Sequence, residues 1–260
     1  ALMKKGIYLT IITIITVICI IGGSLYHLVN FFSYFPFHSA STNTNGTEES
    51  IDSASIRQLE GFDNIWADVD VSDILITRGE DYAIDYQATK NIAPKYEVKN
   101  GTLTIKQTIR HRRFGDYGTH NRSCKITITI PKDATLSSIE LDTNVGDISI
   151  DSIVADELIT DSNVGDTKIQ QCSIASIETD SSVGDTKITD CSFTDLDSDS
   201  DVGDIIIKSA QDLSDYEMEL DTNIGDVTIN KRSHKRSYEQ SGTAGSITLD
   251  NSTGDISLSY

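Results

Sequence analysis

From Leu136 to the end of the chain, apolar and polar residues alternate with a period of two, and a nine-residue phrase recurs. The first copy, DTNVGDISI, begins at Asp142, and the later copies follow at steps of 19, 19, 19 and 22 residues. Alternation with period two is typical of β-strands, and self-similarity at a fixed step of this length marks a solenoid, in which each repeat packs against its neighbours. The pattern therefore predicts an all-β fold, a parallel β-solenoid of the single-stranded β-helix type with about 19–22 residues per coil.

Equivalent positions in the phrases indicate which side chains fill the interior. Each coil is expected to run strand, turn, strand, turn, so that residues one repeat apart stack in register. We expect three interior columns, which comprise Val145, Val164, Val183, Val202 and Ile224; Ile150, Ile169, Ile188, Ile207 and Ile229; and Ile139, Leu158, Ile177, Leu196 and Met218. A leucine-rich repeat has a similar length, but the leucine-and-asparagine consensus of that class is missing here.

A glycine followed by an aspartate marks one corner of every phrase. The glycines at positions 146, 165, 184, 203 and 225 supply a backbone conformation closed to residues with a side chain, most simply a positive φ. The aspartate after each glycine can bond the amides of its own turn. These glycines are therefore expected to form corners rather than a phosphate site.

The two ends of the repeat array depart from the regular pattern. At the carboxyl end, AGSITLDNSTGDISLSY has two glycines only nine residues apart, at 245 and 254, which predicts a half-coil that caps the stack. At the amino end, residues 56–132 contain short alternating strands, and ADVDVSDILI near Ala67 is a degenerate copy of the phrase with Ser72 in place of glycine. Between two such strands, Asn100-Gly101 predicts a hairpin with a two-residue type I′ turn.

The amino-terminal segment has the length and composition of a membrane span. Residues 7–28 form a mostly apolar run that is long enough to cross a hydrocarbon layer of roughly 30 Å. Lys4 and Lys5 precede the run, no Lys or Arg follows it before Arg57, and aromatic residues gather at 31–37, where an interfacial belt belongs. The alternative is a cleavable signal peptide, because the small residues at 22–24 could serve as its cleavage site.

These features divide the chain into three parts. Residues 1–29 are predicted to be a transmembrane signal-anchor with a short cytoplasmic N-terminus, and 30–55 an interfacial aromatic segment and flexible linker. Residues 56–260 are predicted to form an extracytoplasmic β-solenoid domain, with irregular first coils in 56–135 and regular repeats and a cap in 136–260. The expected location is the cell membrane, with a single pass and the C-terminal domain outside the cytoplasm.

Charge narrows the range of partners. The net charge of −19 repels nucleic acid and anionic surfaces and attracts cations. Two aspartate columns recur in the phrases: Asp142, Asp161, Asp180, Asp199 and Asp221; and Asp147, Asp166, Asp185, Asp204 and Asp226. Carboxylates stacked about 4.8 Å apart repel by about 0.9 kcal/mol per pair in bulk water. One hypothesis is that Ca²⁺ binds these columns; the other is that the aspartates satisfy turn amides and remain solvated, so that no cofactor is required.

Two basic clusters interrupt the acidic pattern. Between Leu136 and Ile229 there are 23 Asp or Glu residues against three Lys, whereas basic residues gather in two loops. The residues concerned are Arg110, Arg112, Arg113, Arg122, Lys231, Arg232, Lys235 and Arg236. They predict a contact site for cell-wall polyanions, phospholipid headgroups or an acidic partner protein; the alternative is a pair of solvated loops that lessen self-repulsion.

The remaining reactive side chains do not form a catalytic pattern. The five histidines lack the spacing of metal ligands, and repeated identical aspartates do not make the paired carboxyls of a glycosidase, so we do not expect an enzyme. Cys172 and Cys191 are 19 residues apart and share a column with Ile153 and Ala210. They are either free core thiols or a disulfide between adjacent coils, although in-register strands orient the sulfurs poorly for that bond.

The succession GFDNIWADVDVSDILITRG, VKNGTLTI, KITITIP and serial VGD strands over residues 56–260 resembles a bacterial family of β-strand-repeat proteins, the proposed adhesins that include LiaG-like envelope proteins. The resemblance implies one amino-terminal membrane segment, an extracytoplasmic β-solenoid and no catalytic residues. The function expected is that of a non-catalytic, membrane-anchored cell-envelope protein for adhesion, envelope-stress signalling or partner binding. Its partners would be the cytoplasmic membrane, through the first helix, and an envelope protein or cell-wall polymer. A calcium-binding structural repeat and an envelope polysaccharide hydrolase are the alternatives.

Overall fold

A computed structural model describes residues 51–89, 92–108 and 124–260, which lie within one compact unit, Glu49–Tyr260. These residues form strands and turns, so the predicted all-β fold is confirmed for them. None of the described residues belongs to a helix long and apolar enough to cross a membrane. The predicted membrane segment and the basic loop at 110–122 lie outside the described residues.

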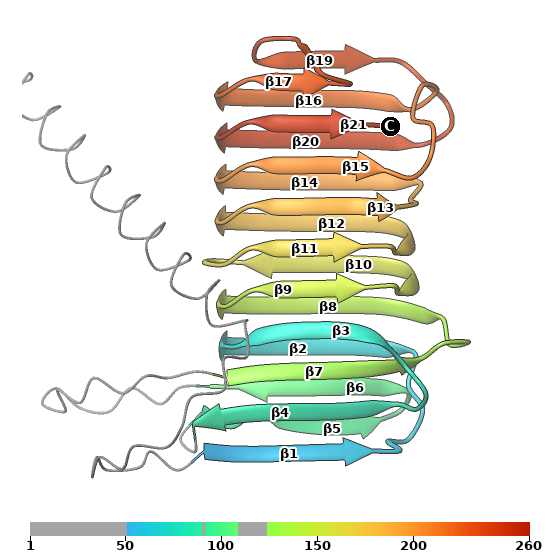
Figure 1. Cartoon of the computed structure of the whole chain (residues 1–260), viewed down its shortest axis with the longest axis vertical. Helices are drawn as coiled ribbons and strands as arrows, with labels where there is room; N and C mark the ends of the chain where they lie inside the picture. The colour runs from blue at the N-terminus through green and yellow to red at the C-terminus, as the bar shows by residue number, and fades with distance from the viewer. Residues whose placement is uncertain (1–50, 90–91, 109–123) are drawn as a thin grey trace, which may run out of the picture. The chain divides into compact units, whose positions relative to one another are not determined.

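The alternating segments pair into two sheets that face each other across one interior (Figure 1). In spatial order, one sheet of the described chain contains eleven strands: β1 (Ile51–Arg57), β4 (Ala83–Thr89), β7 (Cys124–Pro131), β3 (Asp73–Gly79), β9 (Ile148–Asp151), β11 (Thr167–Gln170), β13 (Thr186–Cys191), β15 (Ile205–Ser209), β21 (Ile256–Ser259), β17 (Val227–Ile229) and β18 (Arg232–Ser233). The other contains ten: β19 (Ser237–Gln240), β16 (Glu217–Ile224), β20 (Ser246–Thr253), β14 (Asp195–Val202), β12 (Ser173–Val183), β10 (Val154–Ser162), β8 (Leu136–Val145), β2 (Asn64–Val71), β6 (Thr102–Gln107) and β5 (Lys95–Lys99).

One repeat of the sequence corresponds to one coil, which contributes one strand to each sheet. Adjacent coils pair in parallel and in register, as Leu158 does with Ile139 on one side and Ile177 on the other. The same 19-residue step aligns Ile169 with Ile188 in the opposite sheet. Side chains one repeat apart therefore form straight columns along the stack, both inside and outside.

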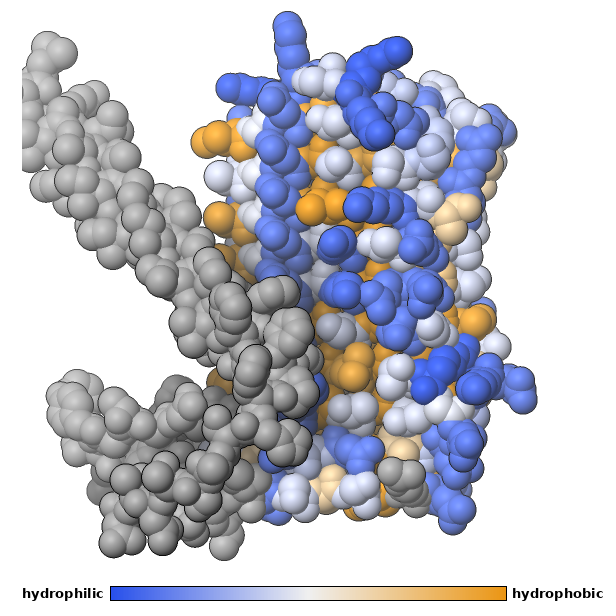
Figure 2. Space-filling view, viewed as in Figure 1, coloured by the Kyte–Doolittle hydropathy of each residue, from blue (hydrophilic) through white to orange (hydrophobic). Residues whose placement is uncertain are grey.

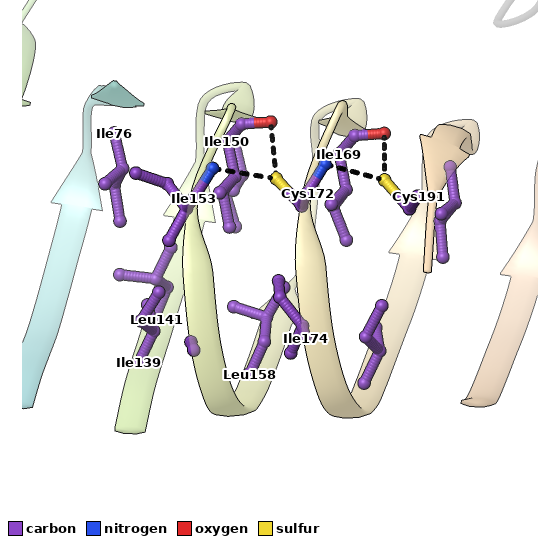
Figure 3. Close-up of a cluster of buried hydrophobic side chains, with 14 of the residues drawn as sticks. Ile76, Ile139, Leu141, Ile150, Ile153, Leu158, Ile169, Cys172, Ile174 and Cys191 are labelled. Atoms are coloured by element: carbon purple, nitrogen blue, oxygen red, sulfur yellow. Dashed lines mark hydrogen bonds between the residues drawn. The ribbon is translucent and has the colours of Figure 1, made fainter. Parts of the chain in front are cut away.

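Two of the three predicted interior columns are buried. The columns that contain Ile139 and Ile150 are at most 5% exposed throughout. Figure 3 shows members of both columns extending from the two sheets toward the common interior. Polar side chains also lie inside, because strand alternation carries further columns inward, among them the column of Thr143, Ser162, Ser181, Ser200, Asn251 and Thr222.

The third predicted interior column was wrong. Val145, Val164, Val183 and Val202 are 45–47% exposed, and Ile224 is 66% exposed. Each of these residues directly precedes the corner, and the chain turns there toward the opposite sheet. The period-two alternation of a flat strand no longer applies at such a bend, so these side chains point over the outside of the corner.

The corner glycines are required by close backbone approach as well as by dihedral angle. Gly165 and Gly184 have φ of 149° and 150°, and a Cβ atom on either would overlap the carbonyl oxygen of the glycine in the preceding coil. Gly225 differs from the prediction, because it is not among the positive-φ residues. A Cβ atom there would still overlap the carbonyl oxygen of Gly254, so close approach alone selects glycine.

The carboxyl end is not the predicted half-coil cap. β20 and β21 form a whole coil, and this coil lies between the coil β14/β15 and the coil β16/β17 (Figure 1). The last segment of the chain is thus internal to the stack. Gly245 is not a corner equivalent to Gly254; a Cβ atom on Gly245 would overlap the carbonyl oxygen of Thr194. The end of the stack is closed instead by β18, which pairs antiparallel with β17, and by β19, which pairs antiparallel with β16.

The amino end shows a similar insertion. β2 and β3 pair with β8 and β9 on one side and with β6 and β7 on the other. Val71 pairs with Val145, so the degenerate phrase with Ser72 at its corner is confirmed as an equivalent coil. Asn100 and Gly101, with φ of 52° and 76°, form the predicted hairpin turn between β5 and β6. Residues 51–55, predicted as linker, are instead part of β1, which pairs antiparallel with β4.

Candidate interaction surfaces

The aspartate after each corner glycine forms a continuous ladder along one outer edge of the stack. The Oδ1 atom of Asp147 accepts the backbone N–H of Asp166 at 3.0 Å, and Asp166 accepts that of Asp185 at 3.0 Å. The ladder begins at Asp73 and continues through Asp204 and Asp255 to Asp226, with distances of 2.8–3.1 Å. The expected bond to the amides of its own turn was wrong: because coils stack in register, each side chain reaches the amide of the next coil.

The aspartate that opens each phrase forms a second, solvent-facing column on the ten-stranded sheet. Asp142, Asp161, Asp180, Asp199 and Asp221 belong to it, and Asp250 lies between the last two because of the inserted coil. Partial burial raises the pKa of Asp142 above its ordinary value, and the carboxylate of Asp161 raises it further. Burial and neighbouring carboxylates also raise the pKa of Asp180 and Asp199. Like charges in this column therefore repel one another.

The aspartate columns are not drawn together into a closed cage of ligands. Throughout residues 51–89, 92–108 and 124–260, no group of three or more His, Cys, Asp or Glu side chains is placed to hold a metal ion. The Oδ1 atoms of the corner ladder already accept backbone N–H groups, as those of Asp147 and Asp166 do. The ten predicted positions thus lie in two open rows along the surface.

Half of the predicted basic site lies in the described part of the chain. Arg110, Arg112, Arg113 and Arg122 fall outside it. The other four are exposed on β18 and on the loops on either side of it: Lys231, Arg232, Lys235 and Arg236. Figure 2 shows long hydrophilic side chains projecting from this end of the stack. We name these four residues the basic cap.

Local backbone bonds hold the basic cap in place. Thr222 donates its N–H to the carbonyl of Arg236 at 2.8 Å, and His234 donates its N–H to Val227 at 2.8 Å. The rings of His234 and Tyr238 meet edge to face, 4.7 Å apart. The backbone of the cap is therefore held in place, and its four exposed cations stand on a stack whose sides are acidic.

The valines before the corner glycines form an outward-facing surface, although the sequence pattern predicted that they lie in the interior. Val145 and its equivalents form a row of exposed apolar side chains along the corner, next to the aspartate ladder. The signal in the sequence was their position directly before the corner glycine in each phrase. Whether that position faces in or out depends on the direction in which the chain turns.

Cys172 and Cys191, one repeat apart, have a structural role at the corner opposite the glycines. Cys172 and Cys191 are buried and free, and their thiols contact backbone groups of neighbouring coils (Figure 3). The Cys172 Sγ atom accepts the N–H of Ile153 at 3.4 Å, and Cys191 Sγ accepts the N–H of Cys172 at 3.4 Å. Contact with the Cys191 thiol and burial raise the pKa of Cys172. Cys191 pairs with Ser209, not Ala210 as expected, because a bulge shifts the register there.

A shallow groove of about 330 Å³ lies on the outer face of β1, β4 and β7. Its lining includes the carboxylate of Asp85 together with Lys125 and Tyr86, and no second carboxylate. Glycoside hydrolysis needs two carboxyl groups that flank the bond. This groove lacks such a pair, whereas a neighbouring groove of about 230 Å³ is lined by the carboxylates of Glu80, Asp81 and Asp85.

Comparisons with known proteins agree with the strand-repeat pattern. Residues 62–260 match the family model described as Toastrack DUF4097. Among solved structures, a proposed cell adhesion protein of Clostridium sporogenes is similar, with 13% identity, 81% of this chain and 99% of that chain covered, and a TM-score of 0.46. A proposed adhesin of Bacteroides fragilis has 17% identity, 81% and 98% coverage, and a TM-score of 0.42.

A proposed lipid binding protein of Parabacteroides distasonis has 14% identity, 80% and 96% coverage, and a TM-score of 0.27. None of the curated proteins matches this chain.

Proposed function

The chain belongs to the Toastrack DUF4097 family, and from this premise we propose that it is a non-catalytic, membrane-anchored cell-envelope protein. Its rigid β-solenoid would stand outside the cytoplasm and present a surface for adhesion, envelope-stress signalling or partner binding. The apolar run at 7–28, with lysines only on its amino side, supports the anchor. The basic cap on an acidic stack is the observation that carries the binding role.

The proposed ligand of the basic cap is an envelope polyanion. Lys231, Arg232, Lys235 and Arg236 are exposed within one short segment, so their charges act on the same ligand. The acidic columns repel polyanions from the sides of the stack, and this leaves the cap as the favoured point of approach. A flexible phosphate polymer can reach the cap end-on, whereas a rigid duplex nucleic acid would also face the acidic sides.

Titration of the full-length chain with poly(glycerol phosphate), followed by sedimentation or fluorescence anisotropy, tests this role. Replacing all four cap residues with Ala should weaken binding by about tenfold or more, since each lost contact removes an ion pair. The matched control replaces Lys168, Lys187 and Lys208, which are exposed on the sides of the stack. Equal losses in both variants would contradict a cap-specific site.

Exposure outside the cytoplasm has its own test. A peptide tag placed after Tyr260 should be removed when intact cells are treated with a protease that cannot cross the membrane. A tag that survives in intact cells and is removed after lysis would contradict the proposed orientation.

A calcium-ordered repeat is the second candidate, favoured by the repulsion within the Asp142 column. Neighbouring carboxylates contribute to the raised pKa of Asp142, Asp180 and Asp199, and a divalent cation near them would relieve that repulsion. Millimolar Ca²⁺ should then raise the melting temperature of the full-length chain by several degrees more than equal Mg²⁺ does. Equal effects of the two ions would indicate screening of charge rather than a site.

A further inference from the structure

One row of exposed apolar side chains runs along the glycine corner of the stack. In spatial order the row comprises Val71, Val145, Val164, Val183, Val202, Thr253 and Ile224. We name it the valine ridge. Apart from Val71 and Thr253, its members are among the few large apolar residues of the described chain that are exposed, at 45–66%. With about 4.8 Å between coils, seven members span roughly 29 Å.

The valine ridge projects from the stack rather than lining a hollow. Figure 2 shows hydrophobic side chains standing out at one edge of the upper stack, directly beside a continuous column of hydrophilic side chains. The aspartate ladder borders the ridge at the corner, because each of its members, such as Asp166 and Asp185, follows a ridge residue by two positions. On the other side of the ridge, the residue before each ridge member is polar, as Asn144 and Asp201 are. The surface is thus an apolar line bordered by the carboxylates of the aspartate ladder on one side and by polar, mostly uncharged side chains on the other.

Contiguous exposed apolar rows on a repeat scaffold indicate an interaction surface, because water contact with them is unfavourable. The ridge position does not require an apolar residue, since Thr253 occupies it in one coil. The neighbouring coils nevertheless carry β-branched apolar side chains. A partner that removes this row from water would gain apolar burial along its full length.

Two occupants match the spacing of the ridge. A second copy of the chain has the same interval of about 4.8 Å and could pack ridge to ridge. However, the net charge of each copy is −19, and ridge-to-ridge contact would bring two aspartate ladders together. Like charges at such distances oppose association. The charge therefore excludes the second copy as the favoured occupant at low ionic strength.

An α-helix also matches the interval. Successive turns of a helical apolar stripe lie about 5.4 Å apart, close to the ridge spacing, whereas alternate residues of an extended strand lie about 6.6 Å apart. Lysine or arginine beside the stripe would reach the aspartate ladder. About 19 helical residues would cover the roughly 29 Å of the ridge.

We propose that the valine ridge docks a basic amphipathic helix of a partner protein. The apolar stripe of this helix would cover the row of ridge side chains from Val145 to Ile224, and its basic residues would lie against the aspartate ladder. This inference rests on the proposed role of the stack as a binding scaffold. It concerns different residues from the basic cap and a partner of opposite charge. Ridge variants should therefore leave poly(glycerol phosphate) binding unchanged, and failure of one proposal is distinguishable from failure of the other.

The probe is a dye-labelled helical peptide of about 19 residues, in which Leu at alternating three- and four-residue steps is flanked by Lys. Two peptides serve as controls: one with Glu in place of Lys, and one with the same composition but no apolar stripe. Fluorescence anisotropy with the full-length chain gives the affinity of each. The test variant is Val164→Ser with Val183→Ser, and the matched control is Val154→Ser, which is 39% exposed and lies away from the ridge.

The proposal expects the Lys peptide to bind, the two ridge substitutions to weaken it by about tenfold, and Val154→Ser to leave it unchanged. Rising salt should weaken binding. Equal binding of the striped and unstriped Lys peptides, or equal binding to the parent chain and the ridge variant, would overturn the proposal. So would dimerisation of the chain at high salt that is lost in the ridge variant while the peptide does not bind, since that outcome assigns the ridge to a second copy.

Discussion

The Oδ1 atom of Asp147 accepts the backbone N–H of Asp166 at 3.0 Å, one 19-residue repeat later in the chain. The bond joins two coils rather than the two ends of one turn, and it recurs along the whole corner. Each aspartate is therefore both a charge on the surface and an acceptor that fixes the height of the next corner. These two roles have opposite effects on stability and can be separated by substitution.

Asp166→Ala should destabilise the stack, because it removes the acceptor of the Asp185 N–H. The expected loss is about 1 kcal/mol, or roughly 2–4 °C in melting temperature. Asp166→Asn keeps an acceptor oxygen and removes a repelling charge, so its melting temperature should equal or exceed that of the parent chain. Thermal unfolding at low ionic strength measures both. A loss in Asn equal to that in Ala would show that the charge, not the hydrogen bond, is required.

Gly184→Ala should lower the free energy of unfolding by about 3 kcal/mol or more. The added Cβ atom overlaps the carbonyl oxygen of Gly165, and φ at residue 184 is 150°. Gly61 is the control, because a Cβ atom there would meet only Tyr82 Cε2 at 3.6 Å, an ordinary contact. Urea titration of Gly184→Ala and Gly61→Ala compares them. Similar midpoints would contradict the close approach of the corners.

The column that contains Asp180 predicts a pH dependence of known sign. The pKa of Asp180 is raised in the folded state above the ordinary 3.8. The contribution of this side chain to stability is therefore greatest below pH 3.8 and is lost as the pH rises through the raised pKa. At neutral pH the charge is destabilising. Asp180→Asn should therefore raise the melting temperature at pH 7 by about 1–3 °C.

This gain should shrink as the pH falls toward 4 and as salt is added. Melting curves of Asp180→Asn and the parent chain across pH 4–7 provide the measurement. A gain that is constant with pH would assign the effect to packing rather than to charge.

Burial and the raised pKa of Cys172 predict slow alkylation of its thiol in the folded chain. In a Cys19→Ser background, iodoacetamide at pH 8 should modify the remaining cysteines only as fast as the stack unfolds. Val154→Cys, at an exposed position, supplies a fast-reacting control. Rapid modification of Cys172 without urea would show that the corner opens locally.

Truncation of the chain after Gly245 should lower the stability of the stack much more than the loss of a terminal cap would. The missing coil pairs with β14 and β16, and its four large buried side chains are Ile247, Leu249, Ile256 and Leu258. At about 1.5 kcal/mol or more each, their loss amounts to about 6 kcal/mol or more. Urea unfolding compares this chain with one that lacks only Tyr260. A small difference would contradict the inserted position of the last coil.

The sequence by itself determined the all-β class, the length of a coil, the columns of Ile139 and Ile150, and the glycine corners. These features follow from period-two alternation and a fixed repeat, which act between residues close in the chain or one coil apart. The resemblance to a strand-repeat family was likewise visible in the phrases themselves, and the match over residues 62–260 agrees with it.

Tertiary structure alone decided three other features. The last coil lies between two earlier ones because strand pairing selects complementary columns, not chain order, and no local pattern records that choice. Val145 faces outward because the corner rotates the chain out of the strand alternation. Asp147 reaches Asp166 rather than its own turn because the coils stack about 4.8 Å apart, within reach of a side chain. Each of these depends on contacts between coils, which exist only after the stack has formed.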